Sequence, residues 1–259
     1  MLGRRGVAIQ KEVVIGTCTM YSDITSVRYK LALRFLEEAQ RAGYWVIVVD
    51  RSKEPSIRDN FRALGATVWE FDDSCAPYGE QQRLLFQILG GIARIKDLIA
   101  VYTQPEKVTL TNFLPALTGP VANNEAALVV GARTPTGLAS YPPYMIELEL
   151  EANRVYAECT GLIGFDPTFS VYAFSATAAY YFANCKPAEY RIPDMWIDLF
   201  ATILALRAGV KLKSVAVDFR YPPEQLEDEL RAGNAAIRQK RIAQRDAFIA
   251  GFGAFSTAR

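Results

Sequence analysis

The sequence predicts an α/β fold in which a mostly parallel β-sheet is flanked by helices on both faces. Three observations lead to this prediction. Short apolar runs of strand length alternate with longer segments whose apolar residues recur at helical spacing. Small or polar residues follow each apolar run, as in the βα loops of open sheets. The chain has 259 residues, 51% hydrophobic and 22% charged, which suits one compact globular unit.

The amino-terminal part predicts a β-α-β-α-β unit. A β-branched run at 13–16 is expected to be the first strand, and a small polar loop follows it. Residues 25–42 predict a helix, with Ser22 or Asp23 as its N-cap and Gly43 as its terminator. Right-handed crossovers then place the following strands side by side in one sheet.

The remaining elements follow from the same patterns. Further strands are expected at 44–49, 67–71, 98–102, 127–131 and 212–219. Further helices are expected at 55–65, 81–95, 194–206 and 224–248, with another in the Thr- and Pro-rich stretch after 102. Residues 160–174, rich in Gly and aromatic side chains, predict a loop and a strand. A long segment opens at Pro142 and carries three alternating glutamates, which a helix would spread over different faces.

Composition excludes several classes of function. The chain has no histidine, which removes Ser-His-Asp and Cys-His catalysis, zinc held by histidine, and an imidazole base. Acid–base chemistry must therefore fall to Asp, Glu, Lys, Tyr or Cys. The four cysteines form no CxxC pair, so no zinc ribbon is expected. The net charge of +1 gives no general electrostatic case for binding nucleic acid.

Hydropathy favours a cytoplasmic protein. No apolar run approaches the roughly 18–20 residues of a transmembrane helix. The amino-terminal stretch MLGRRGVAIQKE also lacks the apolar core of a signal peptide. We therefore expect no transmembrane segment, and the sequence leaves open whether the chain forms a homo-oligomer.

Common nucleotide-binding motifs are absent. The first βα turn, IGTCTMYSD, is not G-x-G-x-x-G, and the chain has no Walker loop. Dinucleotide or ATP binding of those kinds is therefore not expected.

The order of several short motifs resembles the GT-A glycosyltransferase fold, in particular the family-2 enzymes. In chain order these motifs are VVIGTCTMYSD, VIVVDRS, GEQQR, LIAVYTQPEK, ALVVGART, TGLIGFDPTF and PDMWIDLF, within about residues 11–220. The resemblance implies one GT-A-like domain over 1–259. It would comprise a nucleotide-binding half at about 11–135, an acceptor half at about 136–220, and a carboxy-terminal helix and tail at 221–259.

The resemblance also implies a binding site for a nucleotide sugar. Thr17 and Thr19 would line the nucleotide pocket, and Asp50 would contact the uracil or ribose with Ser52 nearby. The other interpretation of Asp50 is a cap at the end of its strand. The resemblance further assigns to the donor the start of the next helix, with Gly79, Gln82 and Arg83. A helix amino terminus with an arginine favours anions, although this arginine also suits a solvated helix face.

The turn after residue 102 departs from the family, because YTQPEK replaces the Asp-x-Asp pair that holds a metal ion. Gln104, Glu106 and Lys107 stand there instead. A Mg²⁺ or Mn²⁺ ion would find one carboxylate, Glu106, and would depend on substrate phosphates for its other ligands. Either Lys107 and Arg133 neutralise the diphosphate, or the fold has lost or changed its chemistry. Arg133 has a second interpretation, which is pairing with a glutamate of the segment after Pro142.

The resemblance places a catalytic base late in the chain. An inverting transfer needs a base that deprotonates the acceptor hydroxyl, and a carboxylate suits a chain without histidine. Asp194, at a predicted helix start, is the first candidate, and Asp166 is the second. Their structural alternatives are a helix N-cap and an Asp-Pro turn.

The function that this resemblance implies is transfer of a sugar from a nucleotide diphosphate donor to a hydroxyl acceptor by single displacement. A nucleotidyltransferase acting on a sugar phosphate is a second hypothesis, and the missing Gly-rich, Lys-containing loop counts against it. A third is a non-catalytic binder of sugar nucleotides or carbohydrates, which the missing Asp-x-Asp pair would explain.

Overall fold

One seven-stranded sheet organises the molecule. The structure is a computed structural model that describes residues 12–72, 76–190, 192–231 and 235–257. The strands are β1 (Val13–Thr19), β2 (Trp45–Asp50), β3 (Thr67–Glu70), β4 (Ile99–Tyr102), β5 (Leu128–Arg133), β6 (Tyr172–Phe174) and β7 (Leu212–Val217). Their order is β3-β2-β1-β4-β6-β5-β7, and β6 alone runs antiparallel to its neighbours β4 and β5. The predicted mostly parallel α/β sheet is therefore confirmed.

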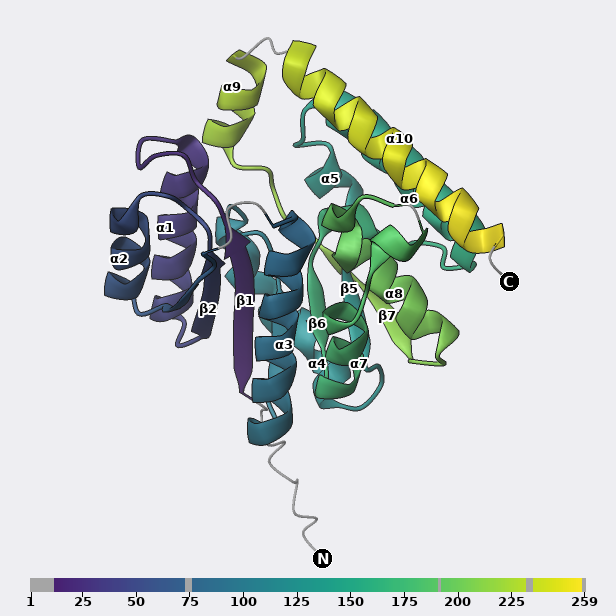
Figure 1. The fold of residues 1–259 in the computed structure, drawn as a ribbon, viewed down its shortest axis with the longest axis horizontal. Helices are drawn as coiled ribbons and strands as arrows, with labels where there is room; N and C mark the ends of the chain where they lie inside the picture. The colour runs from purple at the N-terminus through teal and green to yellow at the C-terminus, as the bar shows by residue number, and fades with distance from the viewer. Residues whose placement is uncertain (1–11, 73–75, 191, 232–234, 258–259) are drawn as a thin grey trace, which may run out of the picture.

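Helices cover both faces of the sheet, as predicted (Figure 1). The face with α3, α7 and α8 is opposite the face with α1, α2 and α4, while α10 packs along α6. The helices are α1 (Val27–Arg41), α2 (Pro55–Ala63), α3 (Tyr78–Lys96), α4 (Leu114–Ala122), α5 (Pro135–Leu138), α6 (Pro143–Thr160), α7 (Ala176–Ala183), α8 (Ile197–Arg207), α9 (Pro223–Arg231) and α10 (Ala235–Thr257). Short 3₁₀ segments are η1 (Val108–Phe113), η2 (Pro167–Phe169), η3 (Pro187–Tyr190) and η4 (Asp194–Trp196).

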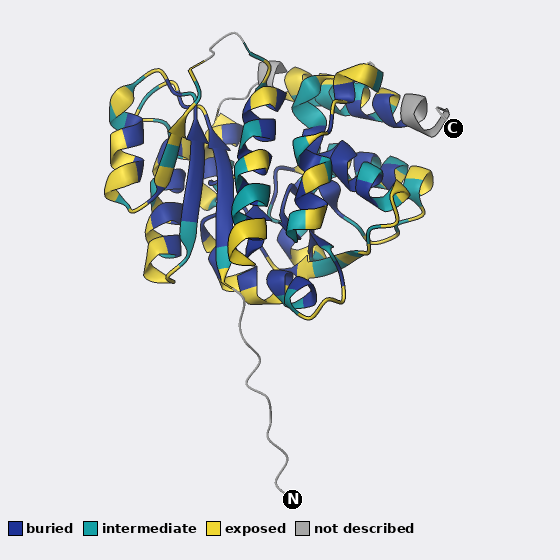
Figure 2. Cartoon of the chain, turned by 60° about the horizontal axis from the view of Figure 1, so that its bottom comes forward, coloured by how far each residue is buried: buried dark blue, intermediate teal, exposed yellow. Residues whose placement is uncertain are grey.

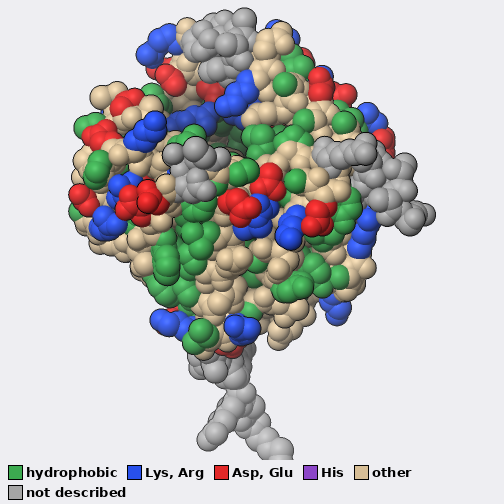
Figure 3. Space-filling model, viewed as in Figure 1, with side chains coloured by type: hydrophobic (Ala, Val, Ile, Leu, Met, Phe, Trp, Pro, Cys, Tyr) green, Lys and Arg blue, Asp and Glu red, His purple; other side chains and the backbone are tan. Residues whose placement is uncertain are grey.

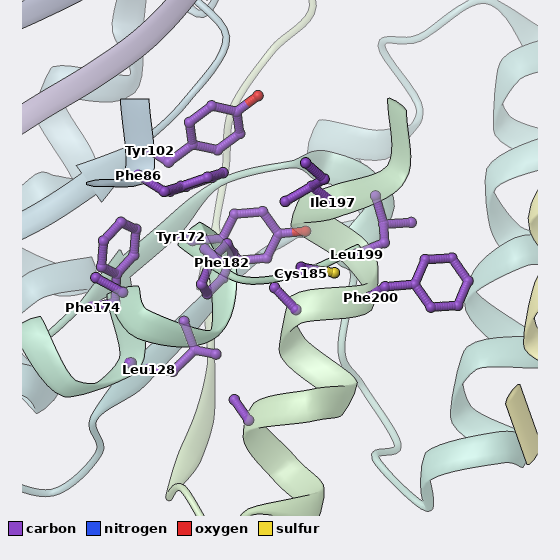
Figure 4. Packing of buried hydrophobic residues seen from close by; sticks show 14 of the residues in the cluster. Phe86, Tyr102, Leu128, Tyr172, Phe174, Phe182, Cys185, Ile197, Leu199 and Phe200 are labelled. Carbon is purple, nitrogen blue, oxygen red and sulfur yellow. The ribbon is translucent and has the colours of Figure 1, made fainter. Parts of the chain in front are cut away.

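The sheet separates two hydrophobic clusters, and its central strands are buried on both faces (Figure 2). On the α3 face, aromatic side chains from α3, β4, β6 and α7 pack against one another (Figure 4). Gly16 lets β1 approach α3 closely, because a Cβ there would press on Leu85 and Leu89. Burial of this kind fixes the carboxyl ends of the strands, which carry the site.

Several local predictions need correction. The N-cap of α1 is Ser26, whose hydroxyl accepts a hydrogen bond from the amide of Tyr29, and neither Ser22 nor Asp23 takes that place. The helix α7 was not predicted, because its sequence ATAAYYFA has no charged face to mark a helical period. The single helix expected at 224–248 is instead two helices, and residues 232–234 between them lie outside the described residues.

Over the described ranges, no helix combines the length and the apolar character that crossing a bilayer requires.

Candidate functional site

A pocket opens at the carboxyl ends of β4 and β5, where open α/β sheets bind ligands. The turn after β4, the end of β5 and η2 form its floor, while α6, α9 and α10 contribute its far wall. Figure 3 shows a hollow near the α9 and α10 end of the viewed face, with Lys, Arg and hydrophobic side chains at its rim. Five cations line this pocket: Arg28, Lys107, Arg133, Arg241 and Arg245.

The turn after β4 points Lys107 into the pocket. Its Nζ donates a hydrogen bond of 2.7 Å to Oε1 of the exposed Gln104 and lies 5.3 Å from the ring centre of Phe169. The residue is only 6% exposed, and burial lowers the pKa of its amine to about 8. Glu106 is half-buried and accepts a hydrogen bond of 3.5 Å from the phenol of Tyr21. The sequence-predicted trio is thus together at the pocket.

Arg133 is held by partners on every side. Its Nε and Nη2 each donate a hydrogen bond of 2.7 Å to Asp166, and Nη1 donates to Glu149 of α6. Its guanidinium also lies over the rings of Tyr141 and Phe169. The alternative interpretation, pairing of Arg133 with a glutamate, is therefore confirmed for Glu149.

Asp166 is the carboxylate that fixes Arg133. Burial disfavours its charge, but the hydrogen bonds and the charge of Arg133 outweigh burial and lower its pKa. Asn153 and Thr168 donate further hydrogen bonds to it. A carboxylate with a lowered pKa and so many donors is a weak base.

Asp194 lies at η4, away from the turn after β4. It forms a two-pronged ion pair with Arg83 of α3, at 2.9 and 2.5 Å, and Arg83 also binds Glu80 and the carbonyl of Cys185. Asp194 is not among the residues that line the pocket. The contact joins α3 to the segment that leads into α8, and α3 can approach so closely because Gly79 has no Cβ to meet the main-chain oxygen of Asp194.

A buried carboxylate that sequence reasoning did not select, Asp198, sits in the first turn of α8. It is 4% exposed, and burial raises its pKa to about 6, although the Ser170 side chain, nearby backbone amides and the charge of Lys107 pull it down. Asp198 is not itself among the residues that line the pocket, but Ser170, whose side chain hydrogen-bonds to it, and Leu199, the next residue, both are. The available signal was an acid inside the apolar run MWIDLF, since such a charge is costly to bury without a use.

The residues assigned to the nucleotide form a compact network at the ends of β1 and β2. Asp50 is fully buried and accepts hydrogen bonds of 2.7 Å from the hydroxyls of both Thr19 and Ser52. Arg58 of α2 completes the cluster, with its guanidinium 3.5 Å from Asp50. Thr17 is also fully buried, and its hydroxyl has no partner within the described structure.

The structure does not bring all the predicted donor residues together. Thr17, Thr19 and Asp50 lie on the face of the sheet that α1 and α2 cover, because they alternate with residues that face α3. Gln82 lies on the opposite face, where its amide donates to the phenol of Tyr102. Arg83 lies there too. These assignments stay predictions.

A second buried carboxylate that was missed, Glu229 of α9, ties the far wall together. It accepts hydrogen bonds from Arg28 at 2.9 Å, Tyr221 at 3.0 Å and Tyr144 at 2.6 Å, and Arg241 lies 3.9 Å away. Because α9 thus contacts α1, α6 and α10, it is positioned over one side of the pocket. The sequence showed only a charged helix here.

Trp196 was also missed. It lines the pocket, and its indole Nε1 is buried without a hydrogen-bond partner in the described structure. Such a donor suits an oxygen of a ligand.

The pocket offers few ligands for a metal ion. Over the ranges that the structure describes, no group of three or more His, Cys, Asp or Glu side chains is arranged to hold one. Glu106 is the carboxylate at the turn where Asp-x-Asp was expected, and the carboxylates of Asp166 and Glu149 nearby are already bound to Arg133. The donor set does not fit a divalent ion held by the protein alone.

No protein-family model matches the chain, and a search of curated proteins finds no match in sequence. Solved structures do match it. Glucosyl-3-phosphoglycerate synthase from Mycobacterium tuberculosis, in complex with phosphoglyceric acid, is 17% identical, and the match covers 94% of this chain and 81% of that chain with a TM-score of 0.56.

The same enzyme in complex with Mn²⁺, uridine diphosphate and glucosyl-3-phosphoglycerate is 16% identical, with the same coverage and a TM-score of 0.52. A crystal structure described as a mycobacterial protein is 17% identical over 94% of this chain and 75% of that chain, with a TM-score of 0.60. The chain therefore has a GT-A-like fold, as the sequence predicted.

Proposed function

We propose that this protein is a glycosyltransferase that moves a sugar from a nucleotide diphosphate donor to a hydroxyl acceptor. The observation that carries the proposal is the pocket at the carboxyl ends of β4 and β5, which the buried Lys107 lines and behind whose lining residues Ser170 and Leu199 the buried carboxylate of Asp198 lies. The similar Mycobacterium tuberculosis synthase has been solved with uridine-diphosphate-glucose, phosphoglyceric acid and Mn²⁺. This supports a nucleotide sugar as the donor here.

Asp198 is the general base in this proposal. A carboxylate whose pKa is about 6 is ionised at neutral pH and still basic enough to take a proton from a hydroxyl as it attacks. The bond from the acceptor oxygen to the anomeric carbon forms while the bond from that carbon to the diphosphate oxygen breaks. The proton goes to Asp198, and the electron pair of the broken bond stays on the diphosphate.

The two aspartates favoured from the sequence have other tasks in this proposal. Asp166 orients Arg133, and Asp194 joins η4 to α3 through Arg83. Asp50 with Ser52 and Thr19 shapes the end of the sheet on which the nucleotide would rest. Trp196 donates its free indole N–H to an oxygen of the sugar or the acceptor.

A divalent ion remains an alternative source of positive charge. It would be held by Glu106 together with oxygens of the diphosphate, as the Mn²⁺ of the similar synthase structures suggests. Such an ion would supply Lewis-acid stabilisation of the leaving group.

A thermal-shift screen of nucleoside diphosphates and their sugars, with and without Mn²⁺, tests the proposal. A ligand present at about 100 times its dissociation constant adds about 2.7 kcal/mol to the free energy of unfolding. We expect at least one nucleotide sugar to raise the melting temperature. If none does so in either condition, the proposal is wrong.

A further inference from the structure

We propose that Lys107 takes the place of a metal ion at the donor diphosphate, so that this protein binds nucleoside diphosphates without a divalent cation. The inference rests on the proposed function, and it names the group that neutralises the ligand in that site.

A diphosphate needs a counter-charge when it enters a partly closed pocket, because removing its charges from water is costly unless they are paired. Two sources are open to this chain. One is a metal ion, and the other is a cationic side chain that is free to pair.

The metal route lacks ligands. The turn after β4 offers Glu106, and in the part of the chain that the structure describes no group of three or more acidic, Cys or His residues could hold an ion. The chain has no histidine anywhere. Asp166 and Glu149 would have to leave the buried Arg133 to become ligands, which would leave an unpaired charge.

Four of the five cations that line the pocket already have carboxylate partners. Arg133 pairs with Asp166 and Glu149, and Arg245 pairs with Glu151. Arg28 and Arg241 share Glu229.

Lys107 differs from these four arginines. Its hydrogen bond goes to the neutral amide oxygen of Gln104, and within the described residues it makes no ion pair. It is therefore the cation of the pocket that a new anion would pair with at the smallest loss of existing contacts.

The position of Lys107 fits this role. It follows β4 within the turn where the Asp-x-Asp pair was expected, and the turn is held by the amide of Lys107, which donates to the carbonyl of Gln104. The ring of Phe169 supports its ammonium from one side. The nearby charges of Glu106, Arg133, Glu149 and Asp198 act on it through space.

Titration calorimetry tests the inference. UDP, GDP, ADP and CDP are each titrated into the full-length protein in EDTA and again in excess Mn²⁺. We expect at least one of them to bind in EDTA, with a dissociation constant within about threefold of its value in Mn²⁺. Binding that requires Mn²⁺ would overturn the inference and leave the proposed function standing. Absence of binding in both conditions would overturn the proposed function and this inference with it.

Two variants assign the effect to the residue. Lys107→Met should weaken binding of the diphosphate in EDTA at least tenfold. The control is Lys213→Met, which should not change this binding, because Lys213 is an exposed residue of β7 that pairs with Glu125. Lys107→Met should fold, because an apolar chain of similar shape replaces a buried amine. Unchanged affinity of a folded Lys107→Met protein would contradict the inference.

Two spectroscopic and calorimetric readouts are independent of turnover. The electron paramagnetic resonance signal of free Mn²⁺ should be unchanged when the protein alone is added, and a loss of that signal would contradict the inference. Near pH 8, where burial brings the pKa of the Lys107 amine, binding of a nucleoside diphosphate should take up protons, measured in buffers of different ionisation enthalpy. Lys107→Met should abolish this uptake, and its persistence would also count against Lys107.

Discussion

Burial moves Lys107, which lines the pocket, and Asp198, which lies behind its lining, toward their neutral forms. It raises the pKa of the Asp198 carboxyl to about 6 and lowers the pKa of the Lys107 amine to about 8. A base must be deprotonated to act, and a counter-charge must be protonated. The two residues are both in their working forms only between these values.

The rate of sugar transfer should therefore follow a bell-shaped pH profile. We expect kcat/KM to rise as the pH increases through about 6, when Asp198 loses its proton, and to fall above about 8, when Lys107 becomes neutral. Steady-state rates across this range measure it. Lys107→Met should lose the alkaline limb, and an alkaline limb that survives in this variant would exclude Lys107 as its source.

Asp198 should also cost stability at neutral pH. The pKa of the Asp198 carboxyl is about 6 in the folded protein and about 4 in the unfolded chain. Its contribution to the free energy of unfolding is therefore fully present below about pH 4 and is lost as the pH rises through about 6. Asp198→Asn should then be more stable than wild type at pH 7, by about 1–3 kcal/mol, while losing transfer activity. Urea denaturation measures this difference.

Asp166→Asn is the matched control and should destabilise the protein, because the lowered pKa of Asp166 reflects its pairing with Arg133. Equal losses of stability in both variants would contradict this account.

At the scale of elements, the start of α3 is fixed by a close approach to η4. Gly79 has no room for a Cβ against Asp194, and Arg83 one turn later binds the same aspartate. The contact holds the segment that leads into Asp198, so its loss should disturb the site from a distance.

Gly79→Ala should destabilise the protein by about 1–3 kcal/mol, because the added methyl group meets main-chain atoms that cannot move aside. Gly91→Ala in the same helix is the control, since nothing lies near its Cβ position, and it should stabilise by about 0.5–1 kcal/mol. Thermal and urea denaturation of the pair measure both effects. A Gly79→Ala protein as stable as Gly91→Ala would show that α3 and η4 are not tightly packed.

The helix α9 depends on one buried carboxylate. Glu229→Ala should cost about 1–3 kcal/mol, because it leaves the buried Tyr221 hydroxyl without its acceptor and breaks the contacts with Arg28 and Arg241. Amide hydrogen exchange should show the loss of protection concentrated in α9. The exposed pair of Glu224 with Arg34 gives the control, and Glu224→Ala should change stability by less than about 1 kcal/mol. Similar small effects for both variants would mean that Glu229 does not hold α9 in place.

At the scale of the molecule, periodicity was enough to predict the sheet. The runs at β1, β2 and β4 are short and buried on both faces of the sheet, which is typical of parallel strands. The antiparallel placement of β6 between β4 and β5, and the helix α7 behind it, depend on contacts between distant segments, and the local pattern of YAF or ATAAYYFA does not encode them.

The site was harder to predict than the fold, for a physical reason. A carboxylate can act as a base only if no arginine is paired with it, and the folded structure decides which carboxylates are paired. Arg133 binds Asp166 and Arg83 binds Asp194, across 33 and 111 residues of sequence, and both pairings are invisible to spacing arguments. Lys107 was identified because it lies in the polar turn that follows a buried strand, whereas Asp198 was hidden in an apolar run that suits a core helix equally well.

Consumption of the donor tests the central claim most directly. Wild-type protein and Asp198→Asn are incubated with a panel of nucleotide sugars and hydroxyl acceptors, and released nucleoside diphosphate is measured. We predict release from at least one donor with wild type, and a rate at least about 100-fold lower for the variant, which still binds that donor. No release from any donor, or equal rates for the two proteins, would contradict a glycosyltransferase that uses Asp198 as its base.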